Sequence, residues 1–151
     1  MDMPSDDLLK GRVSRTGQIY HITTTTEGRL PLFRDFTMAR LVITEMRRLQ
    51  EQNLLDSFAW VLMPDHLHWL LQLNGPLALS TLVKVFKGRT ARQLGLLLPN
   101  SRSIWQKGFH DHAIRREEDL RKIARYIVAN PLRAGLVERI GEYPFWDARW
   151  L

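Results

Sequence analysis

The segment from Ser57 to Leu73, which reads SFAWVLMPDHLHWLLQL, constrains the fold of this chain more than any other. Two apolar runs rich in leucine and aromatic residues stand on either side of Pro64 and Asp65, a pair that is typical of tight turns. The segment therefore predicts a β-hairpin, with strands at 57–63 and 66–73 that lie antiparallel in one sheet.

The other elements follow from the spacing of apolar residues and from the signals that start and stop helices. In chain order they are a strand at 17–26, a helix at 36–53 capped by Asp35 or Thr37, a helix at 77–94, a strand or extended segment at 104–115, and a helix at 117–130 that Pro131 ends. With the hairpin, the order is β-α-β-β-α-β followed by one more helix. It predicts an α+β domain with a ferredoxin-like antiparallel sheet and an additional C-terminal helix. We expect the aromatic segment 143–151 to pack back on this body.

Composition predicts one folded domain, because 44% of the 151 residues are hydrophobic and 25% are charged. We expect a flexible N-terminal tail at 1–13 and a single domain at 14–151. The chain has no cysteine, which excludes disulfides, thiolate metal sites and a cysteine nucleophile. No apolar run approaches the ~18 residues of a membrane span, and the N-terminus has no apolar signal core. We therefore expect a cytoplasmic protein without a membrane partner.

The chain is basic, with 22 Lys and Arg against 16 Asp and Glu and a formal net charge of +6. An excess of this kind favours polyanionic partners such as nucleic acids. A basic surface without such a partner is an equally good interpretation of the charge alone.

The second strand of the hairpin carries two histidines on one face. Side chains alternate along a strand, so Leu67, Trp69, Leu71 and Leu73 point one way and can be core, while His66 and His68 point the other way. Two neutral imidazoles on one face can hold a divalent ion, which we expect on the solvent side of the sheet. The alternative is a pair of structural histidines beside the turn.

A second histidine pair, His110 and His112, has the same spacing and could by spacing alone be the metal site. It ranks below the first pair because it lacks a full alternating apolar face. Surface histidines, or histidines that line a DNA groove, explain it as well. We expect His21 to be structural or to support a ligand.

The last predicted helix presents a tyrosine at the edge of its apolar stripe, which consists of Leu120, Ile123, Ala124 and Ile127. Tyr126 has Lys122 four residues before it and Asn130 four residues after it, so the three side chains fall on one line of the helix. They would present an amine, a phenol and an amide together. A boundary tyrosine with a hydrated hydroxyl explains the same pattern.

Several blocks of sequence resemble one family. MPDHLH at 63–68 and YIVANPLRAGLV at 126–137 resemble the REP-associated tyrosine transposases, which belong to the single-tyrosine HUH transposases, named for a histidine–hydrophobic–histidine motif. GQIYHIT at 17–23, PLF at 31–33 and WQKGFHDHAIR at 105–115 resemble further blocks, in the family's order. The resemblance covers residues 14–150.

This resemblance implies an HUH transposase-like catalytic domain with an antiparallel sheet and flanking helices. It implies Mg²⁺ or Mn²⁺ held by His66 and His68, with Asn130 as a third ligand, because some relatives place a polar ligand four residues after the tyrosine. It implies that Tyr126 attacks single-stranded DNA and forms a 5′-phosphotyrosine. The implied substrates are hairpins such as repetitive extragenic palindromes, and the implied protein acts as a monomer or a homodimer.

Basic residues along the second half of the chain are candidates for contacts with DNA phosphates. They are Lys84, Lys87, Arg89 and Arg92 on the helix at 77–94, and Arg115, Arg116, Lys122 and Arg133 farther along. A solvated helix surface explains some of them equally well. Lys122 could also stabilise a phenolate one turn away.

Two other classes of function remain. A regulator that binds hairpin DNA without cleaving it is the alternative, and the intact His66, His68 and Tyr126 argue against it. An RNA-binding ferredoxin-like module is disfavoured, because the strands at 18–26 and 109–114 lack an aromatic pair flanked by glycine and basic residues.

Overall fold

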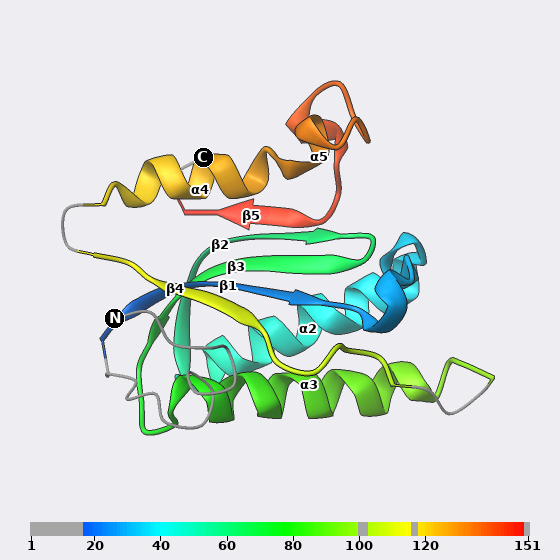
Figure 1. The fold of residues 1–151 in the computed structure, drawn as a ribbon, viewed down its shortest axis with the longest axis horizontal. Helices are drawn as coiled ribbons and strands as arrows, with labels where there is room; N and C mark the ends of the chain where they lie inside the picture. Colours follow the sequence, from blue (N-terminus) through cyan, green and yellow to red (C-terminus); the bar gives the residue numbers. More distant parts are fainter. Residues whose placement is uncertain (1–16, 100–102, 116–117, 150–151) are drawn as a thin grey trace.

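The computed structural model describes residues 17–99, 103–115 and 118–149. The predicted tail at 1–13 and the candidate Arg116 lie outside these residues. The sheet forms the middle layer of the molecule, with α2 and α3 on one face and α4 on the other (Figure 1).

The sheet has five antiparallel strands in the order β4-β1-β3-β2-β5. They are β1 (Ile19–Thr25), β2 (Leu55–Met63), β3 (His66–Leu73), β4 (His110–Ala113) and β5 (Trp146–Ala148). The hairpin predicted from the sequence is formed by β2 and β3, and the first four strands have the arrangement of a ferredoxin-like sheet. The predicted α+β class is therefore confirmed.

The fifth strand is an addition that the sequence does not predict, because three residues are too few to show an alternating pattern. It pairs with β2, with Trp60 opposite Asp147. Just before it, the hydroxyl of Tyr143 donates a hydrogen bond to the carbonyl of Leu62, and the buried ring of Phe145 packs against Tyr143. Over its described part, the aromatic segment packs on the body of the domain as expected.

Four α-helices are present in the described residues: α2 (Phe36–Glu51), α3 (Leu79–Gly95), α4 (Leu120–Val128) and the short α5 (Asn130–Arg133). Asp35 begins α2 by accepting a hydrogen bond of 3.0 Å from the backbone of Met38, so it is the cap and Thr37 is not. Asp119 caps α4 in the same way. No helix in this part of the chain is both long and apolar enough to cross a membrane.

The helix that carries Tyr126 ends earlier than predicted. It stops at Val128, and Pro131 lies in the first turn of α5, where the missing N–H of proline costs little. Proline cannot donate to the carbonyl of Ile127, and the side-chain amide of Asn130 donates to that carbonyl instead, at 3.1 Å. Asn130 therefore begins a separate short helix, and the predicted continuous helix through Asn130 is interrupted at Ala129.

Both faces of the central strand β3 are covered. The leucines and Trp69 that point toward α2 and α3 are buried, and the Trp69 ring lies 5.7 Å from the Phe86 ring of α3. On the opposite face Leu70 is buried as well, because α4, whose Ala124 and Ile127 are buried, packs there. The histidines were expected on a solvent side of the sheet, and this expectation is wrong because a helix covers that face.

A buried carboxylate joins the two helices on the other face. Glu45 of α2 is fully buried and accepts hydrogen bonds from Arg48 at 3.1 Å and from Arg89 of α3 at 3.2 Å. A buried charge is stable only when it is paired. Arg89, a candidate for DNA contact, thus has a structural partner.

We expect Arg89→Met to lower the free energy of unfolding by about 1.5–3 kcal/mol, because a hydrogen bond from a charged group to Glu45 is lost. Urea denaturation measures this change. Arg92→Met, which alters an exposed residue of the same helix, is the matched control and should change stability little. Equal stability of the two variants would contradict the account of Glu45.

Candidate functional site

The pairing of the strands places all five histidines of the chain on one face of the sheet, and α4 covers this face (Figure 1). Residues directly opposite one another in paired strands share a face. In β1 the alternate residues are His21, Thr23 and Thr25, and their partners are His112 and His110 of β4 and His68 and His66 of β3. The antiparallel pairing of three strands therefore gathers histidines that are up to 91 positions apart in the sequence (21 to 112).

His66 is held by the residue before it. Its Nδ1 lies 2.7 Å from Oδ1 of Asp65, and the other oxygen of Asp65 accepts a hydrogen bond from Arg29 at 3.2 Å. Partial burial raises the pKa of Asp65, but the hydrogen bond and charge of His66 and those of Arg29 outweigh it, and the pKa lies below its usual value. The carboxylate thus stays charged and fixes the ring of His66, as carboxylates do for metal-binding histidines.

His68 is half-buried beside His66, with the two ring centroids 5.0 Å apart. Its Nδ1 lies 3.0 Å from both Nε2 of His21 and Oγ1 of Thr23. Burial, and then the charges of His66, His21 and Arg133, lower the pKa of His68 to about 3. Burial, followed by the charge of His112, also lowers the pKa of His21. His68 is therefore neutral at physiological pH, and the neutral imidazole is the form that binds metals.

Tyr126 projects from α4 with 61% of its surface exposed, although it belongs to a helix that packs on the sheet. The guanidinium carbon of Arg133 lies 3.9 Å from the centre of the Tyr126 ring, which is a cation–π contact. The charge of Arg133 also acts on His68. The positive charge of Arg133 thus acts on both the Tyr126 ring and His68.

A cavity of ≈ 400 Å³ between α4 and strands β1 and β4 brings the phenol to the histidine face. Its lining consists of His21, His112, Ile114, Glu118, Asp119, Lys122, Ile123 and Tyr126. Lys122 and Tyr126 are therefore brought together, as predicted from their spacing. In this cavity Nε2 of His112 lies 3.0 Å from Glu118, so one member of the second histidine pair is bound to a carboxylate.

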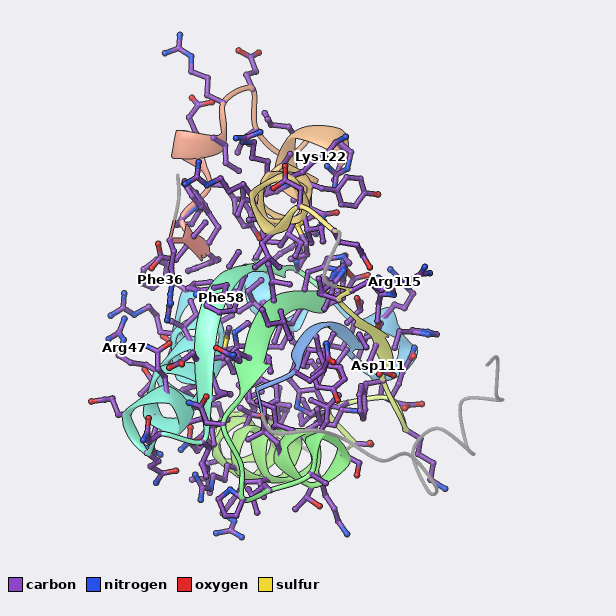
Figure 2. All side chains as sticks on the ribbon, turned by 90° about the vertical axis from the view of Figure 1, so that its left-hand side faces the viewer. Phe36, Arg47, Phe58, Asp111, Arg115 and Lys122 are labelled. Carbon is purple, nitrogen blue, oxygen red and sulfur yellow. The ribbon has the colours of Figure 1, made fainter. Side chains whose placement is uncertain are left out.

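The predicted DNA-contacting residues divide between the two faces of the sheet. Lys122 lies in the α4 layer and Arg115 toward the β4 edge (Figure 2). Arg133 is beside Tyr126. The four candidates on α3 lie on the opposite face (Figure 1). Among them, the amine of Lys87 donates to the carbonyls of Gln106 and Gly108, and burial lowers its pKa to about 8. Lys84 and Arg92 are exposed, and contact of any of these residues with DNA stays a prediction.

Asn130, the predicted third ligand, is half-buried at the start of α5. Its amide nitrogen donates a hydrogen bond to the carbonyl of Ile127. The amide oxygen remains as a ligand atom, and oxygen is the atom type that Mg²⁺ and Mn²⁺ prefer. Among residues 17–99, 103–115 and 118–149, no three His, Cys, Asp or Glu side chains are grouped as a metal site.

Sequence reasoning missed two residues of this site. Asp65 was assigned only to the turn, although a carboxylate directly before a candidate ligand is a signal that can be read from the sequence. Thr23 gives no such signal, because its position opposite His68 follows from the pairing of β1 with β3.

Comparison with known proteins agrees with this geometry. Residues 14–130 match the family model described as transposase IS200 like. A REP-associated tyrosine transposase of Escherichia coli K12 is 31% identical over 112 residues, which are 73% of this chain and 62% of that protein. A protein of Haemophilus influenzae assigned to the same group is 29% identical over 100 residues, 60% of this chain and 57% of that protein. The matches thus span less than two thirds of either relative.

Two solved structures have the same fold. The structure of a REP-associated tyrosine transposase bound to a REP hairpin aligns with a TM-score of 0.70 and 27% identity, over 89% of this chain and 79% of that one. A crystal structure of a Deinococcus radiodurans R1 protein assigned as a transposase aligns with a TM-score of 0.57 and 23% identity, over 84% of this chain and 95% of that one. The resemblance inferred from the sequence motifs is confirmed.

We expect the ring proton of neutral His66 to lie on Nδ1, because the carboxylate of Asp65 at 2.7 Å can only accept a hydrogen bond. Nitrogen-15 NMR of the metal-free protein distinguishes the two tautomers. Asp65→Ala should remove the preference, whereas Arg29→Met, which leaves the carboxylate in place, should keep it. A proton on Nε2 in the unaltered protein would refute this description of the site.

Proposed function

Because the chain belongs to the IS200-like family of transposases, we propose that it cleaves and rejoins single-stranded DNA at hairpins through a covalent bond to Tyr126. The observation that carries this proposal is the placement of Tyr126. The residue is exposed on α4, lines a cavity with His21 of the histidine face, and lies under Arg133, whose charge reaches His68.

The chemistry is a transesterification at phosphorus. The oxygen of Tyr126 attacks the phosphate, a bond from this oxygen to phosphorus forms, and the bond from phosphorus to the 3′ oxygen breaks. The phenol loses its proton and the leaving 3′ oxygen gains one, which yields a 5′-phosphotyrosine and a free 3′-OH. The linkage keeps the energy of the ester, so the 3′-OH of another strand can reverse the step without ATP.

The site fits a divalent metal, Mg²⁺ or Mn²⁺. His66 and His68 would hold it, since each has its Nδ1 engaged and its Nε2 left for a ligand bond, and Asn130 would add an amide oxygen. Such an ion would polarise a non-bridging oxygen of the phosphate and orient the phosphate for attack.

The cations near Tyr126 would act on the phosphate and the phenol. Arg133 lies over the ring of Tyr126, so its guanidinium can bind a phosphate oxygen next to the attacking hydroxyl. Lys122 lines the same cavity and supplies a second positive charge where the phenol oxygen becomes negative. These two residues lie in the same layer as the nucleophile, unlike the cations of α3.

The proposed substrate is a DNA hairpin with a single-stranded flank. The support is the related transposase whose solved structure contains a REP hairpin, together with the formal charge of +6 on this chain. An enzyme with this substrate works where the DNA of the cell is, and we infer a cytoplasmic location for it.

Tyr126→Phe should abolish cleavage and the covalent protein–DNA adduct, because the variant lacks the attacking oxygen. It should still fold and bind hairpin DNA, since the residue is 61% exposed. A denaturing gel of protein incubated with labelled hairpin DNA and Mn²⁺ shows the adduct.

Tyr143→Phe is the matched control, because it removes a tyrosine hydroxyl that donates a hydrogen bond to the carbonyl of Leu62. It should keep the adduct and lose about 0.5–1.5 kcal/mol of stability. An adduct in Tyr126→Phe would refute the assignment of the nucleophile. Hairpin binding without an adduct in the unaltered protein would indicate a regulator that does not cleave.

Arg133→Gln should weaken hairpin binding and reduce the dependence of log Kd on log salt concentration by about 1, because one phosphate contact is lost. Fluorescence anisotropy at several salt concentrations measures both. Arg121→Gln, which changes an exposed arginine of α4, serves as control for net charge. The same loss in both variants would show that Arg133 contributes only its charge to the overall field.

A further inference from the structure

His21 of β1 is in direct contact with His68, and the proposed chemistry gives it no role. Its Nε2 lies 3.0 Å from Nδ1 of His68, and the two ring centroids are 5.2 Å apart. We propose that His21 is a positioning residue, which accepts the Nδ1 proton of His68 in a hydrogen bond and so keeps the Nε2 lone pair of His68 free for a metal ion. This inference rests on the proposed metal site at His66 and His68.

A neutral imidazole carries one ring proton, on either nitrogen, and it binds a metal through the nitrogen without the proton. If Nδ1 of His68 carries the proton, it donates to its neighbour and Nε2 is a ligand. If the neighbour donates to Nδ1, the proton of His68 must be on Nε2, which then cannot bind a metal. The direction of this one hydrogen bond therefore decides whether His68 is a ligand.

Thr23 cannot fix that direction alone. Its hydroxyl lies 3.0 Å from the same Nδ1, but a hydroxyl can donate as well as accept. A neutral His21 with its own proton on Nδ1 offers only a lone pair at Nε2. The ring of His21 also packs against that of His68 at an angle of 43°, which restricts rotation of the His68 ring.

The same arrangement exists on the other side of the pair. Asp65 accepts from Nδ1 of His66, as His21 is proposed to accept from Nδ1 of His68. The rings of His66 and His68 stand at 83° to each other. Each ring thus has its Nδ1 held from outside the pair, and both Nε2 atoms remain for ligation.

The test compares His21→Leu, which removes the acceptor, with His21→Gln, whose side-chain oxygen can accept in its place. His110→Leu is the control, because it removes an exposed histidine from the same sheet face. Nitrogen-15 NMR of the metal-free proteins gives the tautomer of His68, and calorimetry gives the affinity for Mn²⁺ without DNA. Circular dichroism shows whether each variant is folded.

We expect the proton of His68 on Nδ1 in the unaltered protein and in His21→Gln, and a shift toward Nε2 in His21→Leu. The affinity for Mn²⁺ should fall about 10–100-fold in His21→Leu, the usual effect of losing a partner of a metal ligand, and should return in large part in His21→Gln. Cleavage should lose kcat at low Mn²⁺, while KM for DNA stays the same.

A proton on Nε2 of His68 in the unaltered protein overturns the proposal, whatever the variants do. An unchanged Mn²⁺ affinity in folded His21→Leu, or an equal loss in His110→Leu, overturns it as well. If His21→Leu does not fold, the tautomer of the unaltered protein and the Mn²⁺ affinity of His21→Gln decide. A missing DNA adduct together with the expected tautomers and affinities refutes the proposed function and leaves the role of His21 intact.

Discussion

The pairing of β1 with β3 is the constraint on which the site depends. It places Thr23 opposite His68 and Thr25 opposite His66, and so sets His21 diagonally beside His68. A shift of one residue would turn every side chain of a strand to the other face. The buried Trp69 and leucines of β3 oppose such a shift, because they would exchange places with the histidines. The hydrophobic core on one face thus fixes the strand register, and with it the positions of the histidines on the other face.

The second constraint is the cover that α4 provides. A helix packed on the histidine face covers part of it and brings Tyr126 to the cavity that His21 lines. On this face burial is the main cause that lowers the pKa of His68 to about 3. Before Pro131 the helix is interrupted, so that α4 and α5 are separate. Asn130 begins α5, and the guanidinium carbon of Arg133, at the end of α5, lies 3.9 Å from the centre of the Tyr126 ring.

Local patterns predicted much of this structure, and long-range pairing accounts for the rest. The hairpin, the α+β order, the shared face of His66 and His68, and the place of Tyr126 at the edge of its helix's apolar stripe follow from alternation and helix periodicity within short segments, whereas the role of Tyr126 was implied by the family resemblance. β5 is too short to carry a pattern, and the end of α4 depends on how Asn130 replaces the missing N–H of Pro131. The contacts of Thr23 and His21 with His68, and of Arg89 with Glu45, join residues that are 44 to 47 positions apart, and no local pattern predicts them.

The central claim is that the phenol on α4 becomes covalently bound to DNA. Protein incubated with hairpin DNA and Mn²⁺, then digested with nuclease and trypsin, can be mapped by mass spectrometry. The account predicts a nucleotide attached through phosphate to the peptide that contains Tyr126, and a free 3′-OH on the released strand. A nucleotide on a peptide with Tyr20 or Tyr143, or cleaved DNA with no modified peptide, would contradict it.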